Sequence, residues 1–434
     1  MMRRLLALVI ALATATPAWA SSQIILAAGN TATSASATRE HPLMASDAWE
    51  AAGATNQTPI ASAGTLSKLY VSLSVAPDNG AGTQSYAFTL EINDTNTALT
   101  CTISEASTSC NDTSNTVSVS AGDLATWVAV PSGTPVAAIP HITVQFDGST
   151  TKESILGGSG SGNNTATRFY PPHGNEGSGN TTEAVGSETL IPTGGSFKNL
   201  RIVKSDPGVG NTFVWTLRKN SADTALTCTI TSGNTGCTDT SNSVTVAAGD
   251  AVSLSFTQTG TPTASTGRYA VTFVSDTEGE FILAASNTGN VSNAASVYDL
   301  VHMHENSAWN ATETSADQLA QIMTIKAIYV ELNASPGAGT SYTFNLRQNA
   351  SSPGLSCQVS GTNTTCNGSA TISISAADLL ASESTPSGTP TARNPSIAYC
   401  GQIAAAAGTR RMFLISKEDS CVSRWPWSFC SSRN

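Results

Sequence analysis

Three cysteine pairs with one shared spacing are the feature of this chain that most directly suggests chemistry. They are Cys101 and Cys110, Cys228 and Cys237, and Cys357 and Cys366. A zinc site would need close C-x-x-C pairs with histidines nearby, and a redox dithiol would also need C-x-x-C. Eight residues separate the cysteines of each pair, so the spacing predicts a structural disulfide across a β-hairpin, with the two cysteines facing each other.

Each pair lies in a stretch that recurs along the chain. Residues 99–123 read "LTCTISEASTSCNDTSNTVSVSAGD", residues 226–250 "LTCTITSGNTGCTDTSNSVTVAAGD" and residues 355–378 "LSCQVSGTNTTCNGSATISISAAD". The period of 127 to 129 residues is the size of an independent domain and far exceeds a solenoid repeat. We therefore expect three tandem domains over residues 21–151, 152–278 and 279–400, with a divergent tail over residues 401–434.

Within each repeat the apolar residues alternate with polar ones. In "TLSKLYVSLS" the alternation runs through Leu69, Val71 and Leu73, and "TVSVS" and "ITVQF" behave alike. Gly, Pro, Asn and Asp separate these segments. The pattern predicts an all-β chain of three antiparallel β-sandwich domains of about eight short strands each, of the jelly-roll kind.

The order of these segments resembles a known family. "TLRKN" (216–220) is followed by a variable hairpin, then by "VTVAAGDAVSL" (244–254) and "YAVTF" (269–273). This order is similar to the jelly roll of the complement globular-head and tumour necrosis factor superfamily. The resemblance implies a compact domain that works by binding and commonly packs as a trimer. A trimer of chains or an intramolecular pseudo-trimer of the three repeats would both satisfy it.

The first twenty residues have the pattern of a secretory signal peptide. Arg3 and Arg4 precede a short apolar run, and Ala18-Trp19-Ala20 supplies the small residues of a cleavage site. Removal of residues 1–20 would take the formal charge from −10 to −12. We expect a protein that is secreted or held at the cell surface, without a membrane span. The acidic balance argues against nucleic acid as a partner.

The end of the chain departs from the repeat and contains the other three cysteines. Cys421 and Cys430 repeat the eight-residue gap and would form a pair, which leaves Cys400 odd and a candidate for an intermolecular disulfide. Residues 404–434 match nothing upstream and are rich in Arg and Trp. The tail is either a divergent or spurious end, or a terminal docking or export segment.

Two tryptophans and two histidines are the candidate ligand-binding side chains. Trp49 and Trp309 occupy matching places in the first and third repeats, where each would either stack on a sugar ring or close the core. His302, His304 and Glu305 in "VHMHE" could hold a metal ion, but no fourth ligand is visible and a polar strand face is the preferred interpretation. We expect no metal or other cofactor.

Aspartate-rich turns offer a calcium alternative. "NDTSN" (111–115) and "TDTSN" (238–242) each contain one aspartate among other oxygen-bearing side chains, the third repeat has "NGSA" there, and Asp123, Asp250 and Asp378 follow strands at equivalent points. Capping of turns explains these residues without an ion, because Asp side chains accept hydrogen bonds from nearby backbone amides.

Catalytic motifs are missing from the sequence. It contains no G-x-S-x-G, no H-E-x-x-H and no phosphate-binding loop, and its carboxylates are scattered. The sequence favours a non-enzymatic structural or adhesion protein that binds a glycan or another surface protein. A carbohydrate-binding module array and a virion or appendage subunit are the alternatives.

Overall fold

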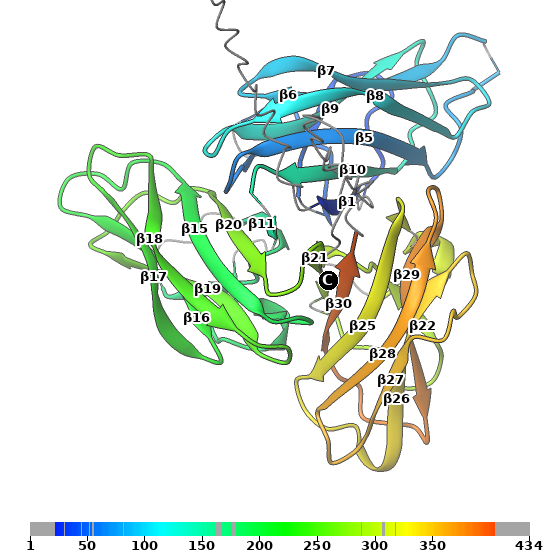
Figure 1. Ribbon diagram of the computed structural model, residues 1–434. Coiled ribbons are helices and arrows are strands. Elements are labelled where there is room, and N and C mark those ends of the chain that lie inside the picture. Colours follow the sequence, from blue (N-terminus) through cyan, green and yellow to red (C-terminus); the bar gives the residue numbers. More distant parts are fainter. Residues whose placement is uncertain are drawn as a thin grey trace, which may run out of the picture.

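A computed structural model describes residues 22–403, apart from residues 30, 45, 52, 54–55, 81, 151, 161–165, 176–178, 288, 306–308 and 317. The expected signal peptide and residues 404–434 of the tail, with Cys421 and Cys430, therefore lie outside the described residues. The described chain forms three sandwiches of two sheets each, which confirms the expected all-β class. Figure 1 shows the three sandwiches arranged around a common centre.

The first domain contains an inner sheet near that centre and an outer sheet. The inner sheet has the order β3 (Ser46–Asp47), β1 (Ser22–Gly29), β10 (Pro140–Gly148), β5 (Gly64–Leu73), β8 (Ser109–Val119). The outer sheet has the order β2 (Arg39–Pro42), β9 (Leu124–Ser132), β6 (Ser85–Ile92), β7 (Thr95–Ser104), and β4 (Thr58–Pro59) also pairs with β9.

The second domain repeats this strand order. Its inner sheet has β13 (Gly174–Asn175), β11 (Glu153–Gly160), β20 (Gly267–Ser275), β15 (Gly195–Val203), β18 (Gly236–Val246). Its outer sheet has β12 (Arg168–Tyr170), β19 (Ala251–Thr259), β16 (Thr212–Lys219), β17 (Ala222–Thr231), with β14 (Thr189–Leu190) beside β19. A single 3₁₀ turn, η2 (Val185–Ser187), precedes β14.

The third domain follows the same plan. Its inner sheet has β23 (Met303–Glu305), β21 (Glu280–Asn287), β30 (Pro395–Gln402), β25 (Met323–Leu332), β28 (Thr365–Ile374). Its outer sheet has β22 (Val297–Asp299), β29 (Leu379–Ser387), β26 (Gly337–Gln348), β27 (Ser356–Gly361), with β24 (Gln318–Leu319) beside β29. A short 3₁₀ turn, η3 (Glu313–Ser315), precedes β24. The last strand runs to Gln402, past the expected limit at residue 400.

Alternating side chains build each core from both sheets. In β6, Tyr86, Phe88 and Leu90 are fully buried while the residues between them are partly exposed. The middle residues of β1, β11 and β21 are apolar on both faces, since each of these strands is buried on both sides. Ile25 faces its own domain, whereas Ile24 joins the core of the third domain. A strand buried on both faces loses the period of two in its sequence.

Hydrogen bonds connect the three domains pairwise. The Gln23 side-chain amide bonds to both the N–H and the C=O of Ile155 at 2.9 Å, joining the first domain to the second. Thr193 Oγ1 donates to Glu280, joining the second to the third. Gln321 Nε2 donates to Lys68 O at 2.6 Å, joining the third back to the first. The three repeats therefore close into a ring within one chain.

No helix in the described part of the chain is long and apolar enough to cross a membrane.

Candidate functional site

The three repeat disulfides are formed, with their Cα atoms 5.7 to 5.8 Å apart. The disulfides predicted between consecutive strands are confirmed, but the two strands that carry each pair belong to different sheets and do not pair with each other. Cys101 lies in β7, which pairs with β6, while Cys110 lies in β8, which pairs with β5 in the other sheet. Each disulfide therefore joins the edge strands of two different sheets and closes the open side of the sandwich. The sequence showed the spacing but not the sheet to which each strand belongs.

Both candidate sugar-stacking tryptophans lie inside the protein. Trp49 and Trp309 are only 6% and 8% exposed. Trp49 packs edge-on against Phe88, with the ring centroids 6.0 Å apart. The His41 ring lies on it at a tilt of 32°, with the centroids 5.1 Å apart. A glycan cannot reach a ring held in this way, so the ligand-binding prediction for these residues is wrong and they act as core lids.

The described residues of "VHMHE" do not form a metal site. His302 is fully buried, and its Nδ1 accepts a hydrogen bond from the Ala284 amide at 3.2 Å. Burial lowers the pKa of His302 to about 3, so this imidazole is neutral. The side chains of His304 and Glu305 lie outside the described residues. Among the residues that are described, no three His, Cys, Asp or Glu side chains form a group that could hold a metal ion.

The aspartates that follow strands cap turns. Asp123 Oδ2 accepts from the Ser120 amide at 2.7 Å, and its Oδ1 accepts from Asn93 Nδ2 at 2.9 Å. Asp250 and Asp378 make the equivalent bonds in the other two domains. In "NDTSN", Asp112 accepts instead from backbone and side-chain N–H groups around it. These carboxylates stabilise the strand connections, which confirms the turn-capping interpretation.

Cys400 lies deep in the interface between the second and third domains. It is 3% exposed, forms no disulfide with any cysteine that the structure describes, and lies in β30 next to the strand that carries Glu280. Burial, with the nearby Glu280 carboxylate, raises the pKa of this thiol to about 12. A buried thiol of this kind is not available for an intermolecular disulfide, so that expectation is wrong.

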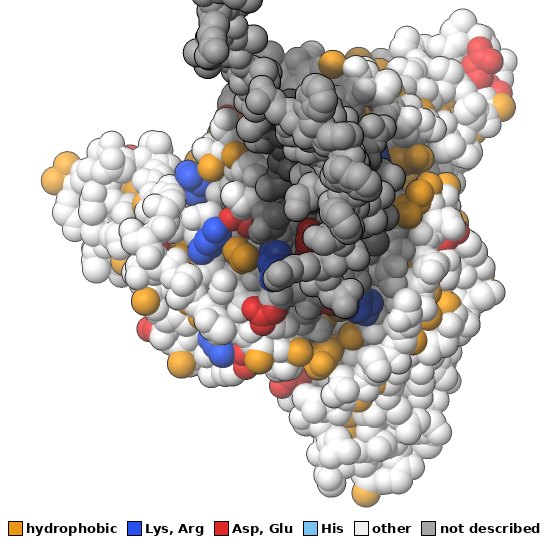
Figure 2. Space-filling model, in the orientation of Figure 1, with side chains coloured by type: hydrophobic (Ala, Val, Ile, Leu, Met, Phe, Trp, Pro, Cys, Tyr) orange, Lys and Arg blue, Asp and Glu red, His pale blue; other side chains and the backbone are white. Residues whose placement is uncertain are grey.

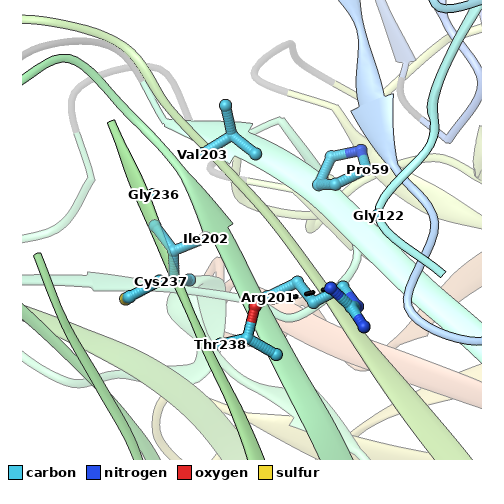
Figure 3. Close-up of a pocket in the computed structure, with 8 residues that line it drawn as sticks. All are labelled: Pro59, Gly122, Arg201, Ile202, Val203, Gly236, Cys237 and Thr238. Atoms are coloured by element: carbon cyan, nitrogen blue, oxygen red, sulfur yellow. Dashed lines mark hydrogen bonds between the residues drawn. The ribbon is translucent and has the colours of Figure 1, made fainter. Parts of the chain in front are cut away.

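A hollow of about 220 Å³ lies where the first domain meets the second. Its walls come from β4 and the turn before β9 in the first domain, and from β15 and β18 in the second; the lining residues are Pro59, Gly122, Arg201, Ile202, Val203, Gly236, Cys237 and Thr238. Figure 3 shows the Arg201 side chain reaching from β15 toward the turn at Gly122. The hollow is thus a mixed apolar and cationic site between domains.

Arg201 is the one charged side chain in this lining. Its Nε donates to Ala61 O at 3.2 Å across the interface, and its Nη1 makes a long 3.4 Å bond to Thr238 Oγ1. Both acceptors are neutral. Burial lowers the pKa of Arg201, although the guanidinium remains charged at any physiological pH.

Sequence reasoning missed Arg201, although the repeats contained a signal. Arg201 pairs with Thr238, the residue after the second cysteine, and Tyr70 and Tyr329 pair with the equivalent residues of β8 and β28. Aligned as "LYVSL", "LRIVK" and "IYVEL", the three strands show one arginine against two tyrosines. Tyr329 packs against the core of the second domain. The difference stands out only once this position is known to face a neighbouring domain.

No family model matches this chain, and no curated protein matches it.

Proposed function

We propose that the chain is a secreted, non-enzymatic protein that binds a biological surface or helps to build an extracellular layer. The observation that carries the proposal is the ring of three equivalent domains held together by hydrogen bonds at all three contacts. Such a particle presents three similar outer sheets from a single chain. Multiple equivalent contact surfaces on one rigid particle raise avidity for a repetitive surface.

The chemistry of the surface and of the disulfides supports this proposal. Only 12% of residues are charged, and the face in Figure 2 is mostly uncharged, with single charged and apolar side chains scattered over it. Three disulfides fit a protein that works in an oxidising compartment outside the cytoplasm. The resemblance to the complement globular-head and tumour necrosis factor superfamily points in the same direction, since it implies a domain that works by binding.

Two measurements on the secreted protein would test the proposal. Light scattering and electron microscopy should show single particles of one chain's mass with a three-lobed outline, and the labelled protein should bind to intact cells or extracellular matrix of its source. Filaments or shells would favour the appendage or virion alternative. Turnover in a broad hydrolase screen, or no surface binding at all, would overturn the proposal.

A further inference from the structure

The hollow beside Arg201 has a charge that the protein does not balance. Arg218 and Arg347 donate to Glu183 and Glu313 at 2.9 Å. Arg201, in contrast, has only the carbonyl of Ala61 and the hydroxyl of Thr238 as hydrogen-bond acceptors among the described residues. A half-buried cation without a carboxylate costs free energy that an anion from solution can offset.

The guanidinium still has donors to offer. It carries five N–H groups, of which two are used, and Nη2 has no acceptor in the part of the chain that the structure describes. Nη1 lies 3.4 Å from where a Cβ on Gly122 would be, so the guanidinium lies directly against this turn of the first domain. The Nη1–Nη2 edge is the geometry that receives a carboxylate through two parallel hydrogen bonds.

Comparison of the three domain contacts shows what differs here. At the contact between the second and third domains, Tyr329 stands at the equivalent place, with its ring 4.0 Å from where a Cβ on Gly249 would be. At the contact between the first and second domains, Arg201 stands against Gly122 and a hollow remains. The pseudo-symmetry of the ring therefore provides its own comparison, because the tyrosine shows what a purely structural residue looks like at this position.

We propose that the hollow between the first and second domains binds a small carboxylate through Arg201. The volume of about 220 Å³ admits one monosaccharide unit or a short organic acid and is smaller than a typical drug-sized site. The Pro59 ring and the Val203 side chain provide an apolar wall, and Thr238 provides a hydroxyl. This inference deepens the proposed function, since a uronic-acid residue on a surface glycan is one source of that carboxylate and a free organic acid is the other.

Calorimetric titration of the full-length secreted protein tests the site. The probes are sodium glucuronate, sodium acetate and glucose at one fixed ionic strength. We expect glucuronate to bind and glucose not to bind. Stronger binding of glucuronate than of acetate would identify a sugar acid, and comparable or stronger binding of acetate would identify a free short acid. Failure of both anions to bind the wild-type protein would overturn the inference.

The variant Arg201→Tyr is the central comparison, because it installs the residue that the other two domains already have. We expect at least a tenfold loss of glucuronate affinity, with a smaller loss for Arg201→Lys, which keeps the charge but not the fork. Arg39→Tyr, which removes the same charge outside this interface, should bind as the wild type does. Equal affinity of Arg201→Tyr and the wild type at an unchanged melting temperature would refute the role of Arg201.

The same variants separate this inference from the proposed function. If Arg201→Tyr retains surface binding but loses glucuronate, the site is real and another face carries adhesion. If the wild type binds glucuronate but no surface, the proposed function fails while the site stands.

Discussion

The ring of Phe281 in β21 lies against Gly401, its partner across the β21–β30 ladder. A Cβ on Gly401 would be only 2.6 Å from that ring. In the other two domains the phenylalanine stands on the opposite strand, where Phe146 and Phe273 occupy the place of Gly401. In the third domain a phenylalanine from the neighbouring strand thus fills the same space. The structural repeat continues through Gly401, although the sequence has no phenylalanine at that position.

This relationship predicts strong coupling between the two positions. Phe281→Ala should destabilise the third domain by about 3 kcal/mol or more because it leaves a cavity. Gly401→Ala should cost about 1–3 kcal/mol, because its methyl group meets the ring. In the double variant that methyl group enters the cavity, so its cost should almost vanish. Thermal unfolding of the four proteins measures the cycle, and strictly additive effects would contradict the packing described.

Loss of the Gln23 side chain should open the contact between the first and second domains locally. Its side chain satisfies the N–H and the C=O of Ile155, and all three groups are buried. Gln23→Leu would leave both backbone groups unpaired, at about 1–3 kcal/mol each. Hydrogen exchange at the Ile155 amide should accelerate. As a control, Gln402→Leu removes an exposed amide bond to Glu278 O and should leave the Ile155 amide unchanged.

Because of Asp112, we expect the first domain to lose stability in acid. Burial opposes ionisation of this carboxyl, but hydrogen bonds from Asn115, Thr100 and Ser114 outweigh it and lower the pKa to about 2. The folded pKa lies below the unfolded value of 3.8, so the stabilisation is present above pH 3.8 and is lost as the pH falls toward 2. We expect Asp112→Asn to cost about 1–2 kcal/mol at pH 7.

The acid titration has a control within the chain. The third domain has Gly368 at the equivalent place and lacks this carboxylate. Unfolding between pH 2 and 5 can be followed domain by domain through amide exchange. The first domain of the wild type should lose stability as the pH falls below 3.8, and the first domain of Asp112→Asn should not show this additional loss. An identical pH profile for wild type and variant would count against the hydrogen-bond network.

Because Lys204 is buried, we expect the second domain to become more stable as the pH rises above 8. It is 4% exposed, its Nζ lies 4.7 Å from the centre of the Phe213 ring and donates to Ser265 O, and burial lowers its pKa to about 8. The folded pKa is below the unfolded value of 10.5, so the cost of the buried charge is full below pH 8 and disappears as the pH rises toward 10.5.

Leucine is the natural replacement for Lys204, because Leu73 and Leu332 donate the equivalent backbone hydrogen bonds in the other domains. Lys204→Leu should raise the stability of the second domain at pH 7 by about 1–3 kcal/mol and should remove the gain between pH 8 and 10.5. Calorimetry at a series of pH values measures both effects. A variant less stable than the wild type at pH 7 would show that the contacts of the ammonium group outweigh its burial.

The disulfides predict a specific pattern of thiol labelling. In the native protein the six paired cysteines and the buried Cys400 should all resist alkylation, and unfolding without a reductant should expose Cys400. Peptide mapping locates the labels, and labelling of any repeat cysteine before reduction would contradict the assignment. Replacing both cysteines of one pair by serine should cost about 2.5–3 kcal/mol, the chain entropy of a ten-residue loop.

The sequence alone determined the local structure and the repeat. Alternation in "LYVSLS" predicts a strand because side chains in a strand point to opposite faces in turn, and the recurring cysteine stretch defines the domain length. The local half of each cap at Asp123, Asp250 and Asp378 also follows from sequence, since one carboxylate oxygen accepts from the amide three residues earlier. These features depend on neighbours in the chain.

Tertiary structure alone decided which distant segments meet. The period of a strand says which residues share a face but not which sheet contains the strand, so the assignment of Cys101 and Cys110 to different sheets was not predictable. The burial of Trp49 and the position of Arg201 opposite Gly122 depend on elements far apart in sequence or in another domain. Packing brings these residues together, and a single sequence carries no direct record of its long-range contacts.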